Sequence, residues 1–497
     1  MKNFVFSLLV PVFLVACNAK PPVPFEEGLE EYPTLQKVLA DTAKYQVQIL
    51  YTQIDRNEHG NPLFTTHSLN LDDSRYFYPA STVKLPIALL ALEWLEEQQI
   101  PGLTLETTML TDSVRPSQLP AWKDSSAQNG LPSIGHYIKK ILLVSDNDAS
   151  NRLYELLGMD YINTKLREKG LANTVITQRL SFPISAEENR QFNPIRFVDT
   201  AGKVLLEIPA READSTYVVP GYPKLGQAYY KNDSLIQGGM DFSYKNKFSL
   251  SDLHGVVQRT IFPEAFVGIE RFNLNEEHRN FVLKYMSMLP RESDYPSYDT
   301  TEFYDSFSKF FKFGTDKAPI PTRYRVFNKT GWSYGHLIDG GYFVDFETGV
   351  EFFVSAIVYV NEDQILNDDK YETDEIGLPF FAEVGDYLYH LELKRKKQIS
   401  PDLSRFKLSY SELYHLPDVR KMVRSAAADR VYQSIIHSAA ADAPAAMLSW
   451  IRGGGSVYHG EFYPKTTIIA FGKNYEQSIL TKIVLNTVNI YLVTYNY

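Results

Sequence analysis

Residues 324–360 read YRVFNKTGWSYGHLIDGGYFVDFETGVEFFVSAIVYV, and in three successive runs their apolar side chains alternate with polar or small ones. Alternation of this kind is typical of β-strands, whose side chains point to opposite faces of a sheet in turn. We predict strands over Tyr324–Asn328, His336–Phe346 and Val350–Val360. Glu347-Thr348-Gly349 supplies a tight turn between the last two. The stretch therefore forms consecutive antiparallel strands of one sheet.

The segments on either side of this stretch extend the pattern. Leu378–Leu393 is predicted to be a helix, and a second helix is predicted over Thr34–Ala43. Two further strands are predicted over Tyr45–Ile54 and Leu63–Leu71. Strands from both ends of a chain can join one antiparallel sheet. We therefore predict an α+β fold with an antiparallel sheet built from N- and C-terminal strands and flanking helices.

The region between these strands is predicted to form a mainly helical lobe. Thr82–Ile100 is a strongly apolar helix, with Pro86 early enough to lie in its first turns, where a proline costs least. Ile134–Val144 and Ala149–Leu157 are predicted helices joined by a short turn, and Gly158 can end the second one. The lobe packs separately from the sheet.

Composition and charge exclude several classes of function. The chain has 497 residues, 44% of them apolar, and a formal net charge of -10, which argues against a nucleic-acid partner. Its single cysteine, Cys17, excludes an internal disulfide and Cys-rich metal clusters. The ten histidines show no spacing typical of a metal site, so we predict no metal and no cofactor.

The first residues predict export and lipid anchoring. The apolar run Phe4–Ala16 is short for a membrane span but suits the core of a secretory signal. Leu14-Val15-Ala16-Cys17 resembles a bacterial lipobox, in which the cysteine is lipidated, although an ordinary signal peptide with a chance cysteine is the alternative. We expect residues 1–17 to be a signal peptide, residues 18–33 to be a solvated tether rich in Pro and Glu, and the mature protein to be a periplasm-facing lipoprotein.

The C-terminal part, residues 401–497, differs from the rest of the chain. From Val419 to Tyr497 eight Lys and Arg face four Asp and Glu, which reverses the charge balance of the whole chain, and the segment SAAAD occurs twice, at Ser425–Asp429 and Ser438–Asp442. Two copies are too few for a repeat array. A partner-binding module, a disordered extension and a non-native fusion all remain open for this tail.

A reactive serine is suggested by Ser81-Thr82-Val83-Lys84 at the start of the apolar helix. Residues three apart on a helix are neighbours on one face, so a hydroxyl and an amine would lie side by side. The lysine can act as a base only if a pocket lowers its pKa. The same spacing recurs at Ser306/Lys309 and Ser404/Lys407, which we expect to be solvated surface pairs.

Two further triplets accompany this motif. Ser145-Asp146-Asn147 lies in the turn between two predicted helices, and Lys329-Thr330-Gly331 lies at the end of a predicted strand. The order SxxK, SDN, KTG in these structural contexts resembles class A β-lactamases and penicillin-binding proteins. The resemblance covers roughly Thr34 to Lys397 and implies a β-lactamase/transpeptidase-like fold for residues 34–400.

The resemblance implies roles for the reacting groups. Ser81 would be the nucleophile and Lys84 its activating amine, while Ser145 would pass a proton to the departing nitrogen. The backbone N–H groups of Ser81 and Trp332 would form the oxyanion hole, with Gly331 allowing close backbone approach. Two lysines near one serine would also lower the pKa of at least one of them.

The resemblance also implies how a substrate is held. Asn147 would bind its side-chain amide, and Lys329 with Thr330 would bind its carboxylate. The expected partner is a small-molecule β-lactam or a peptidoglycan peptide. The leading function is a β-lactamase that confers antibiotic resistance; a D,D-peptidase and a non-catalytic β-lactam-binding protein are the alternatives.

One feature departs from the class A pattern, which places a glutamate four residues before an asparagine in the loop that follows SDN. Here the loop spans Ser181–Pro194, and Glu188 precedes Asn193 by five residues. Glu188 is our candidate for the base that assists deacylation. The alternative is that Glu187, Glu188 and Arg190 only form a solvated loop.

Two other segments bear on the site. Gly331-Trp332-Ser333-Tyr334-Gly335 matches the nucleophile elbow of α/β-hydrolases, but a predicted strand follows where that elbow needs a helix. An insertion near 195–246 is expected to cover the mouth of the active site, with Tyr229, Tyr230 and Met240 in its local core.

Overall fold

The computed structural model describes residues 24–115 and 118–410 and the backbone of four short strands between 459 and 490. The chain divides into two units after Leu408. In the second unit, β18 (His459–Glu461) pairs with β19 (Thr467–Ile469), and β20 (Ile483–Leu485) pairs with β21 (Val488–Ile490). Cys17, the lipobox and both SAAAD segments lie outside the described residues.

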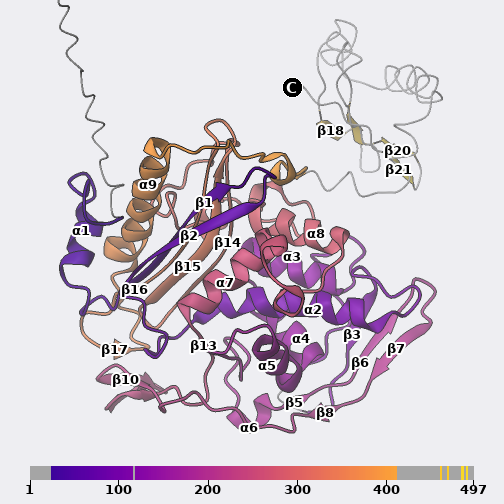
Figure 1. The fold of residues 1–497 in the computed structure, drawn as a ribbon. Coiled ribbons are helices and arrows are strands. Elements are labelled where there is room, and N and C mark those ends of the chain that lie inside the picture. The colour runs from indigo at the N-terminus through magenta and orange to yellow at the C-terminus, as the bar shows by residue number, and fades with distance from the viewer. Residues whose placement is uncertain are drawn as a thin grey trace, which may run out of the picture. The chain divides into compact units, whose positions relative to one another are not determined.

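A five-stranded antiparallel sheet organises the first unit (Figure 1). Its strand order is β14-β15-β16-β1-β2, so β14 forms one edge. The N-terminal strand β1 joins the C-terminal hairpin along β16, with Gln48 opposite Ile357. The predicted α+β sheet built from both ends of the chain is therefore confirmed. The strands are β1 (Gln48–Arg56), β2 (Pro62–Leu69), β14 (Tyr324–Ser333), β15 (His336–Asp345) and β16 (Val350–Tyr359).

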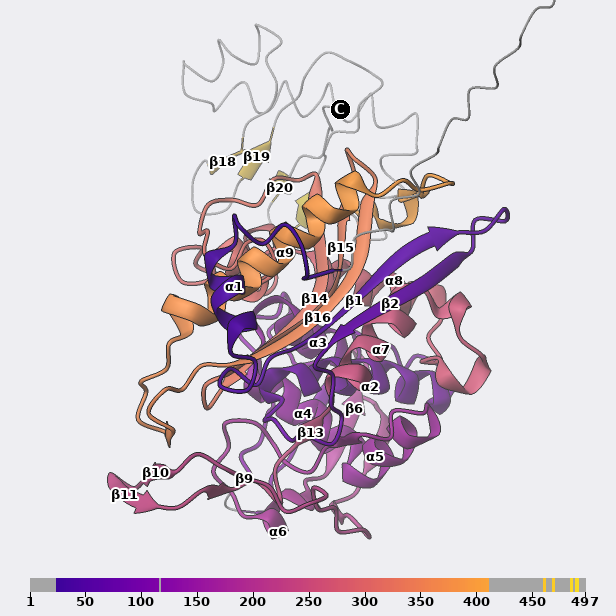
Figure 2. The ribbon, with the colours of Figure 1, turned by 60° about the vertical axis from the view of Figure 1, so that its left-hand side comes forward.

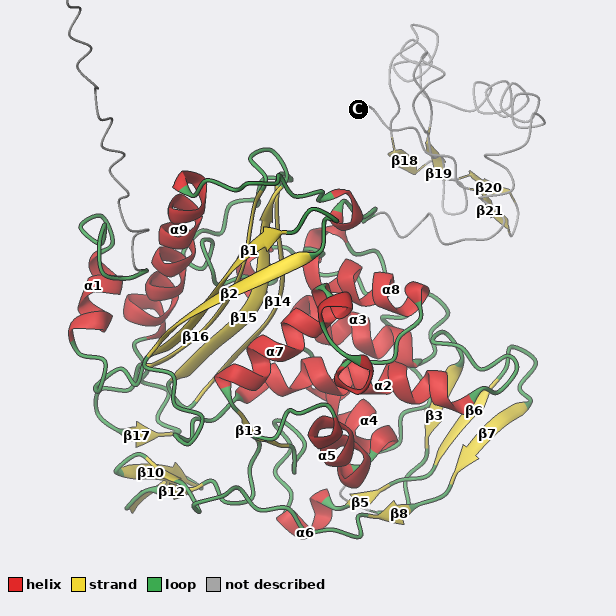
Figure 3. Ribbon diagram, viewed as in Figure 1, coloured by secondary structure: helices red, strands yellow, loops and turns green. Residues whose placement is uncertain are grey.

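Helices cover both faces of this sheet (Figure 3). On one face α1 (Pro33–Ala40) and α9 (Leu378–Lys394) lie over a core to which β16 contributes alternate residues such as Phe352 and Val354. On the other face lies α7 (Leu250–Ile261). There the buried His254 ring contacts two strands, with Nε2 2.8 Å from Thr52 Oγ1 and Nδ1 2.9 Å from Ser355 Oγ.

The helical lobe is built around α2, which continues from the short η1 helix that contains Ser81. Every residue from Leu85 to Leu92 is buried, so this helix is surrounded by neighbouring elements on all sides. Its one deeply buried carboxylate, Glu93, is paired with Lys169 at 2.9 Å. The helices beyond α1, α7 and α9 are η1 (Ala80–Val83), α2 (Lys84–Gln98), α3 (Ile134–Val144), α4 (Asn147–Leu157), α5 (Met159–Glu168), α6 (Ala186–Asn189), η2 (Pro263–Ala265), η3 (Gly268–Glu270), α8 (Glu276–Ser287), η4 (Pro290–Glu292), η5 (Asp305–Ser308), η6 (Thr373–Gly377) and η7 (Ser404–Phe406).

The predicted insertion near 195–246 consists of short strands joined by loops. Tyr230 is exposed, and Tyr229 and Met240 are half-buried, so their prediction as local core is wrong. They lie on short strands that project from the body of the unit, where too few neighbours cover them (Figure 2). The short strands are β3 (Thr108–Thr111), β4 (Thr174–Val175), β5 (Gln191–Phe192), β6 (Ile195–Val198), β7 (Val204–Ile208), β8 (Arg211–Glu212), β9 (Lys224–Leu225), β10 (Ala228–Lys231), β11 (Ser234–Gln237), β12 (Met240–Asp241), β13 (Lys247–Phe248) and β17 (Ile365–Leu366).

Both predicted ends of the folded domain need correction. Phe25 and Tyr32, expected in a solvated tether, are buried, and the Phe25 N–H donates to the Tyr387 hydroxyl at 2.9 Å. At the other end Leu403 and Phe406 are buried, so the fold continues past residue 400. In both places aromatic side chains anchor a segment whose composition alone resembles a linker.

Within residues 24–115 and 118–410, no helix has both the length and the apolar character needed to cross a bilayer. The same described residues contain no group of three or more His, Cys, Asp or Glu side chains arranged to hold a metal ion.

Candidate active site

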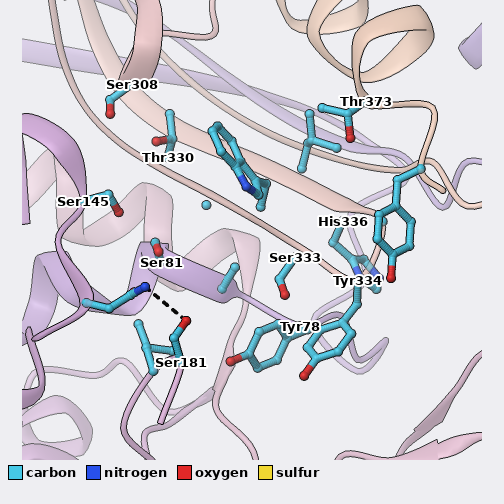
Figure 4. A pocket seen from close by; sticks show the side chains of 18 of the residues that line it. Tyr78, Ser81, Ser145, Ser181, Ser308, Thr330, Ser333, Tyr334, His336 and Thr373 are labelled. Carbon is cyan, nitrogen blue, oxygen red and sulfur yellow. Dashed lines mark hydrogen bonds between the residues drawn. The ribbon is translucent and has the colours of Figure 1, made fainter. Parts of the chain in front are cut away.

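A cavity of about 610 Å³ brings the three sequence motifs together (Figure 4). Ser81 lines it from η1, Ser145 and Asn147 line it from the junction of α3 and α4, and Thr330 lines it from β14. These residues are separated by up to 249 positions in the sequence, yet they face one space. The structure therefore brings residues of the SxxK, SDN and KTG motifs to one cavity.

Several residues at this cavity have left-handed backbone conformations that residues other than glycine rarely adopt. Ala80, Ser145, Ser181 and Tyr334 line the cavity with φ values of 46°, 62°, 49° and 52°. Such conformations persist only where the surrounding structure imposes them, and they concentrate at functional sites. Two of them belong to or directly precede a motif serine, so the backbone holds Ser81 and Ser145 in fixed positions.

Lys84 is fully buried behind the cavity. Its Nζ donates to Asn147 Oδ1 at 2.7 Å, to Ser145 Oγ at 3.2 Å and to the Ser145 backbone carbonyl. Burial lowers the pKa of Lys84 to about 7, although the charge of Asp146 acts in the opposite direction. An amine with this pKa can accept a proton near neutral pH.

Lys329 approaches the same hydroxyl from β14. Its Nζ donates to Ser145 Oγ at 2.7 Å and to the Thr330 carbonyl at 2.8 Å. Burial lowers the pKa of Lys329 well below its usual value, and the charge of Lys84 lowers it further. The expected repulsion between the two lysines is present, but burial is the larger cause. Ser145 Oγ thus connects both amines.

Gly331 lies directly against the turn that carries Ser81. A Cβ atom at this position would lie 2.8 Å from the Pro79 carbonyl oxygen and 2.9 Å from the Ser81 nitrogen. Both are backbone atoms, so nothing flexible could move aside. The triplet was expected at the end of its strand, but β14 continues to Ser333 and carries the KTG backbone past Ser81. Only glycine allows this approach.

Residues 32–208 match the model of the beta-lactamase enzyme family. This region belongs to the beta-lactamase enzyme family. The match includes the Ser81 and Ser145 motifs and supports a hydrolase of the β-lactamase fold. No protein among those of curated function matches the chain.

Several solved structures are similar to this chain. The β-lactamase from Sphaerobacter thermophilus DSM 20745 is 12% identical and has a TM-score of 0.40, covering 75% of this chain and 99% of its own. PBP-A is 17% identical with a TM-score of 0.40, covering 74% and 98%. The β-lactamase from Streptomyces albus G is 12% identical with a TM-score of 0.38, covering 72% and 98%.

The close approach of Gly331 to the Ser81 turn leaves no room for a larger residue at position 331. We expect Gly331→Ala to displace β14 from η1 and to slow labelling of the protein by a β-lactam about 100-fold, because a shift of about 1 Å at a reactive site has effects of this size. Gly268→Ala is the matched control, since a Cβ there meets nothing within 4 Å. The check is the labelling rate and melting temperature of both variants; equal rates would show that β14 tolerates the methyl group.

Glu188 is the predicted site residue that the structure does not bring to the cavity. It lies in α6, where its carboxylate accepts hydrogen bonds from the Ser185 N–H at 2.9 Å and the Ser185 hydroxyl at 2.8 Å. This reciprocal capping arrangement fixes the start of the helix. Among the described residues that line the cavity, the one acid is Asp369, on a different loop. The pair Ser185 and Glu188, three residues apart, is the sequence signal for this capping role.

Trp332 lies at the mouth of the cavity with half of its surface exposed. Its ring stacks on Phe310, with centroids 5.7 Å apart and planes inclined by 14°, and meets Phe307 edge-on at 5.9 Å. These contacts fix the residue whose N–H was predicted for the oxyanion hole. After Trp332, Ser333 and His336 pair across a tight hairpin, so the helix required by a nucleophile elbow is absent there, as predicted.

The cavity extends beyond the predicted residues. Tyr78, Tyr334, His336 and Thr373 line its other end, as Figure 4 shows. His336 is buried, and burial lowers its pKa to about 3 although a backbone hydrogen bond with Ser333 acts in the opposite direction, so the imidazole is neutral. Tyr334 belongs to the elbow-like segment Gly331–Gly335, whereas Tyr78, His336 and Thr373 lie in none of the motifs identified from the sequence. The insertion near 195–246, expected to cover the mouth, contributes no residue to the cavity lining.

Proposed function

We propose that this protein is a class A-like serine hydrolase that reacts with β-lactams through an acyl-enzyme on Ser81. The observation that carries the proposal is the convergence of Lys84 and Lys329 on Ser145 Oγ beside the cavity that Ser81 lines. It supports a route for one proton from the attacking hydroxyl to the departing nitrogen.

The proposed acylation proceeds in balanced steps. The neutral Lys84 amine, one helical turn from Ser81, takes the hydroxyl proton as Oγ bonds to the lactam carbonyl carbon. The oxyanion is stabilised by the N–H groups of Ser81 and Trp332. The C–N bond then breaks, Ser145 gives its proton to the nitrogen, and Lys84 returns its proton to Ser145. The product is an ester on Ser81.

Two sets of groups bind the substrate in this proposal. Asn147, whose Nδ2 donates to Ser181 Oγ at 3.1 Å, faces the side-chain amide of the substrate. Thr330 and Lys329 bind its carboxylate, which would offset the cost of burying two lysines. No cofactor or metal takes part in this mechanism.

Hydrolysis of the ester is proposed to be slow. A turnover of 10 per second and an ester that lasts a day differ by about six decades, or roughly 8 kcal/mol. A general base contributes a factor of about 10²–10⁴ to the rate of such a hydrolysis. Glu188, the candidate base, is held in its helix cap and does not line the cavity. This placement favours, as a second candidate function, a D,D-peptidase that β-lactams inhibit. Antibiotic resistance would require faster hydrolysis than this site supports.

We also propose export and attachment to a bacterial membrane through lipidated Cys17, on the strength of the lipobox-like sequence. Such a location would expose the domain to peptidoglycan peptides and to β-lactams. Metabolic labelling with a fatty-acid probe tests this, with Cys17→Ala expected to lose the label.

The acylation proposal is tested by intact-protein mass spectrometry after mixing with benzylpenicillin, together with nitrocefin hydrolysis. We expect one adduct with the mass of the whole antibiotic, located on the peptide that contains Ser81, and persisting for hours. Glu188→Gln is the control and should keep the same adduct lifetime. Rapid turnover that Glu188→Gln slows would contradict the proposed slow step, and a protein that forms no adduct and hydrolyses no nitrocefin would contradict the function itself.

A further inference from the structure

Ser308 is a wall residue of the cavity that the proposed mechanism does not use. It precedes β14 in the sequence and lines the cavity together with Thr330, as Figure 4 shows. Its exposed fraction is 8%, and its Oγ has no hydrogen-bond partner among the described residues. Buried hydroxyl groups in proteins are normally paired, so an unpaired one at a cavity is available to hydrogen-bond a bound ligand.

The backbone around Ser308 is held at three consecutive residues. The Ser308 carbonyl accepts from Asn328 Nδ2 at 2.9 Å, and Lys309 Nζ donates to Asn328 Oδ1 at 2.7 Å. The Phe310 N–H donates to Asp339 Oδ2 at 3.2 Å. These contacts attach the end of η5 to β14 and β15, so the hydroxyl of Ser308 is kept beside Thr330 without support from its own hydrogen bond.

Lys309 lies directly after Ser308, and its Nζ donates to the Met286 carbonyl and to Asn328 Oδ1. Ser306 and Lys309 were expected to be a solvated surface pair, but both are buried, and Lys309 is only 2% exposed. In the described part of the chain, the buried carboxylate facing Lys309 and Lys329 is that of Asp339. Two buried amines with one carboxylate leave an excess of positive charge when the amines are protonated. An anion at the adjacent wall would favour that protonated state.

We propose that Ser308 is a substrate-binding residue whose Oγ donates a hydrogen bond to the substrate carboxylate beside Thr330. This inference rests on the proposed acylation of Ser81. Ser308 thereby adds to the selection of β-lactams or peptides that carry a free carboxylate. A hydrogen bond to a charged group contributes about 1.5–3 kcal/mol, which corresponds to a factor of about 10–100 in rate or affinity.

The test compares benzylpenicillin with its methyl ester, using the second-order rate of acylation. Wild type should prefer the acid. Ser308→Ala should lower the rate with the acid at least about 10-fold and leave the rate with the ester unchanged, so the acid-to-ester ratio falls by the same factor. Ser308→Thr, which keeps a hydroxyl, should restore the ratio. Ser333→Ala, another serine of the cavity wall, is the matched control and should not alter it.

An unchanged ratio in Ser308→Ala, or an equal fall with the acid and the ester, would overturn the inference. If Ser308→Ala does not fold, Ser308→Cys, which keeps the volume but donates weakly, should show the same loss of preference. Acylation of wild type by neither compound would overturn the proposed function as well, so the two failures are distinguishable.

Discussion

Ser81→Ala is expected to take up no β-lactam at all. The substitution removes the atom that forms the ester and leaves the cavity otherwise intact, because the side chain of Ser81 is only partly buried in the wall. The measurement is intact-protein mass spectrometry after prolonged incubation with benzylpenicillin. Wild-type protein should carry one adduct under the same conditions, while the melting temperature of the variant should stay close to that of wild type.

The Ser81→Ala variant distinguishes Ser81 from the other serine hydroxyl groups of the site. Ser145, Ser181, Ser308 and Ser333 also line the cavity and remain in this variant. An adduct of unchanged mass and rate on Ser81→Ala would place the nucleophile on one of them and refute the assignment of Ser81.

Lys84→Met is expected to slow acylation about 10³-fold, within the range that a positioned general base contributes. Methionine fills a similar volume without an amine, so packing in the buried position is retained. Because burial lowers the pKa of Lys84 to about 7, the amine is protonated below that pH and neutral above it. Only the neutral form can accept the serine proton, so the wild-type acylation rate should rise as the pH increases through about 7.

The control for Lys84 is Lys84→Arg. A guanidinium keeps the positive charge but stays protonated in this pH range, so it should be as slow as methionine if the amine acts as a base. The measurement is the rate of adduct formation from pH 5.5 to 9. A wild-type rate independent of pH, or an active Lys84→Arg variant, would show that Lys84 acts only through its charge.

Local sequence patterns predicted the main elements of this fold. Every residue of β15 and β16 is buried because the sheet is covered on both faces, and each strand ends one residue before its predicted end. The motif serines and lysines were identified because their chemistry requires fixed spacings within one helix or strand. Such spacings are local properties, so they can be identified from the sequence alone.

Other features depend on packing between distant segments, which local patterns do not encode. Lys309 resembles a surface lysine in the sequence, but Asn328 and the Met286 carbonyl bind it in the interior. Phe25 and Tyr32 lie among Pro and Glu residues typical of a linker, yet both are bound to residues of α9 by hydrogen bonds. Glu188 was assigned by analogy to a catalytic position, whereas its own neighbour Ser185 determines its role.

The hairpin formed by β10 and β11 has a consequence for how substrate range can change. β10 pairs in parallel with β17, and Asn367, which lines the cavity, donates from its Nδ2 to the Tyr230 carbonyl at 3.1 Å. The hairpin projects from the body of the unit, as Figure 2 shows, and its side chains are largely exposed. Lengthening or shortening it would reposition one rim of the cavity while leaving Ser81, Lys84 and Ser145 undisturbed. Substrate selectivity could therefore change through the length of this hairpin, without any substitution among the reacting groups.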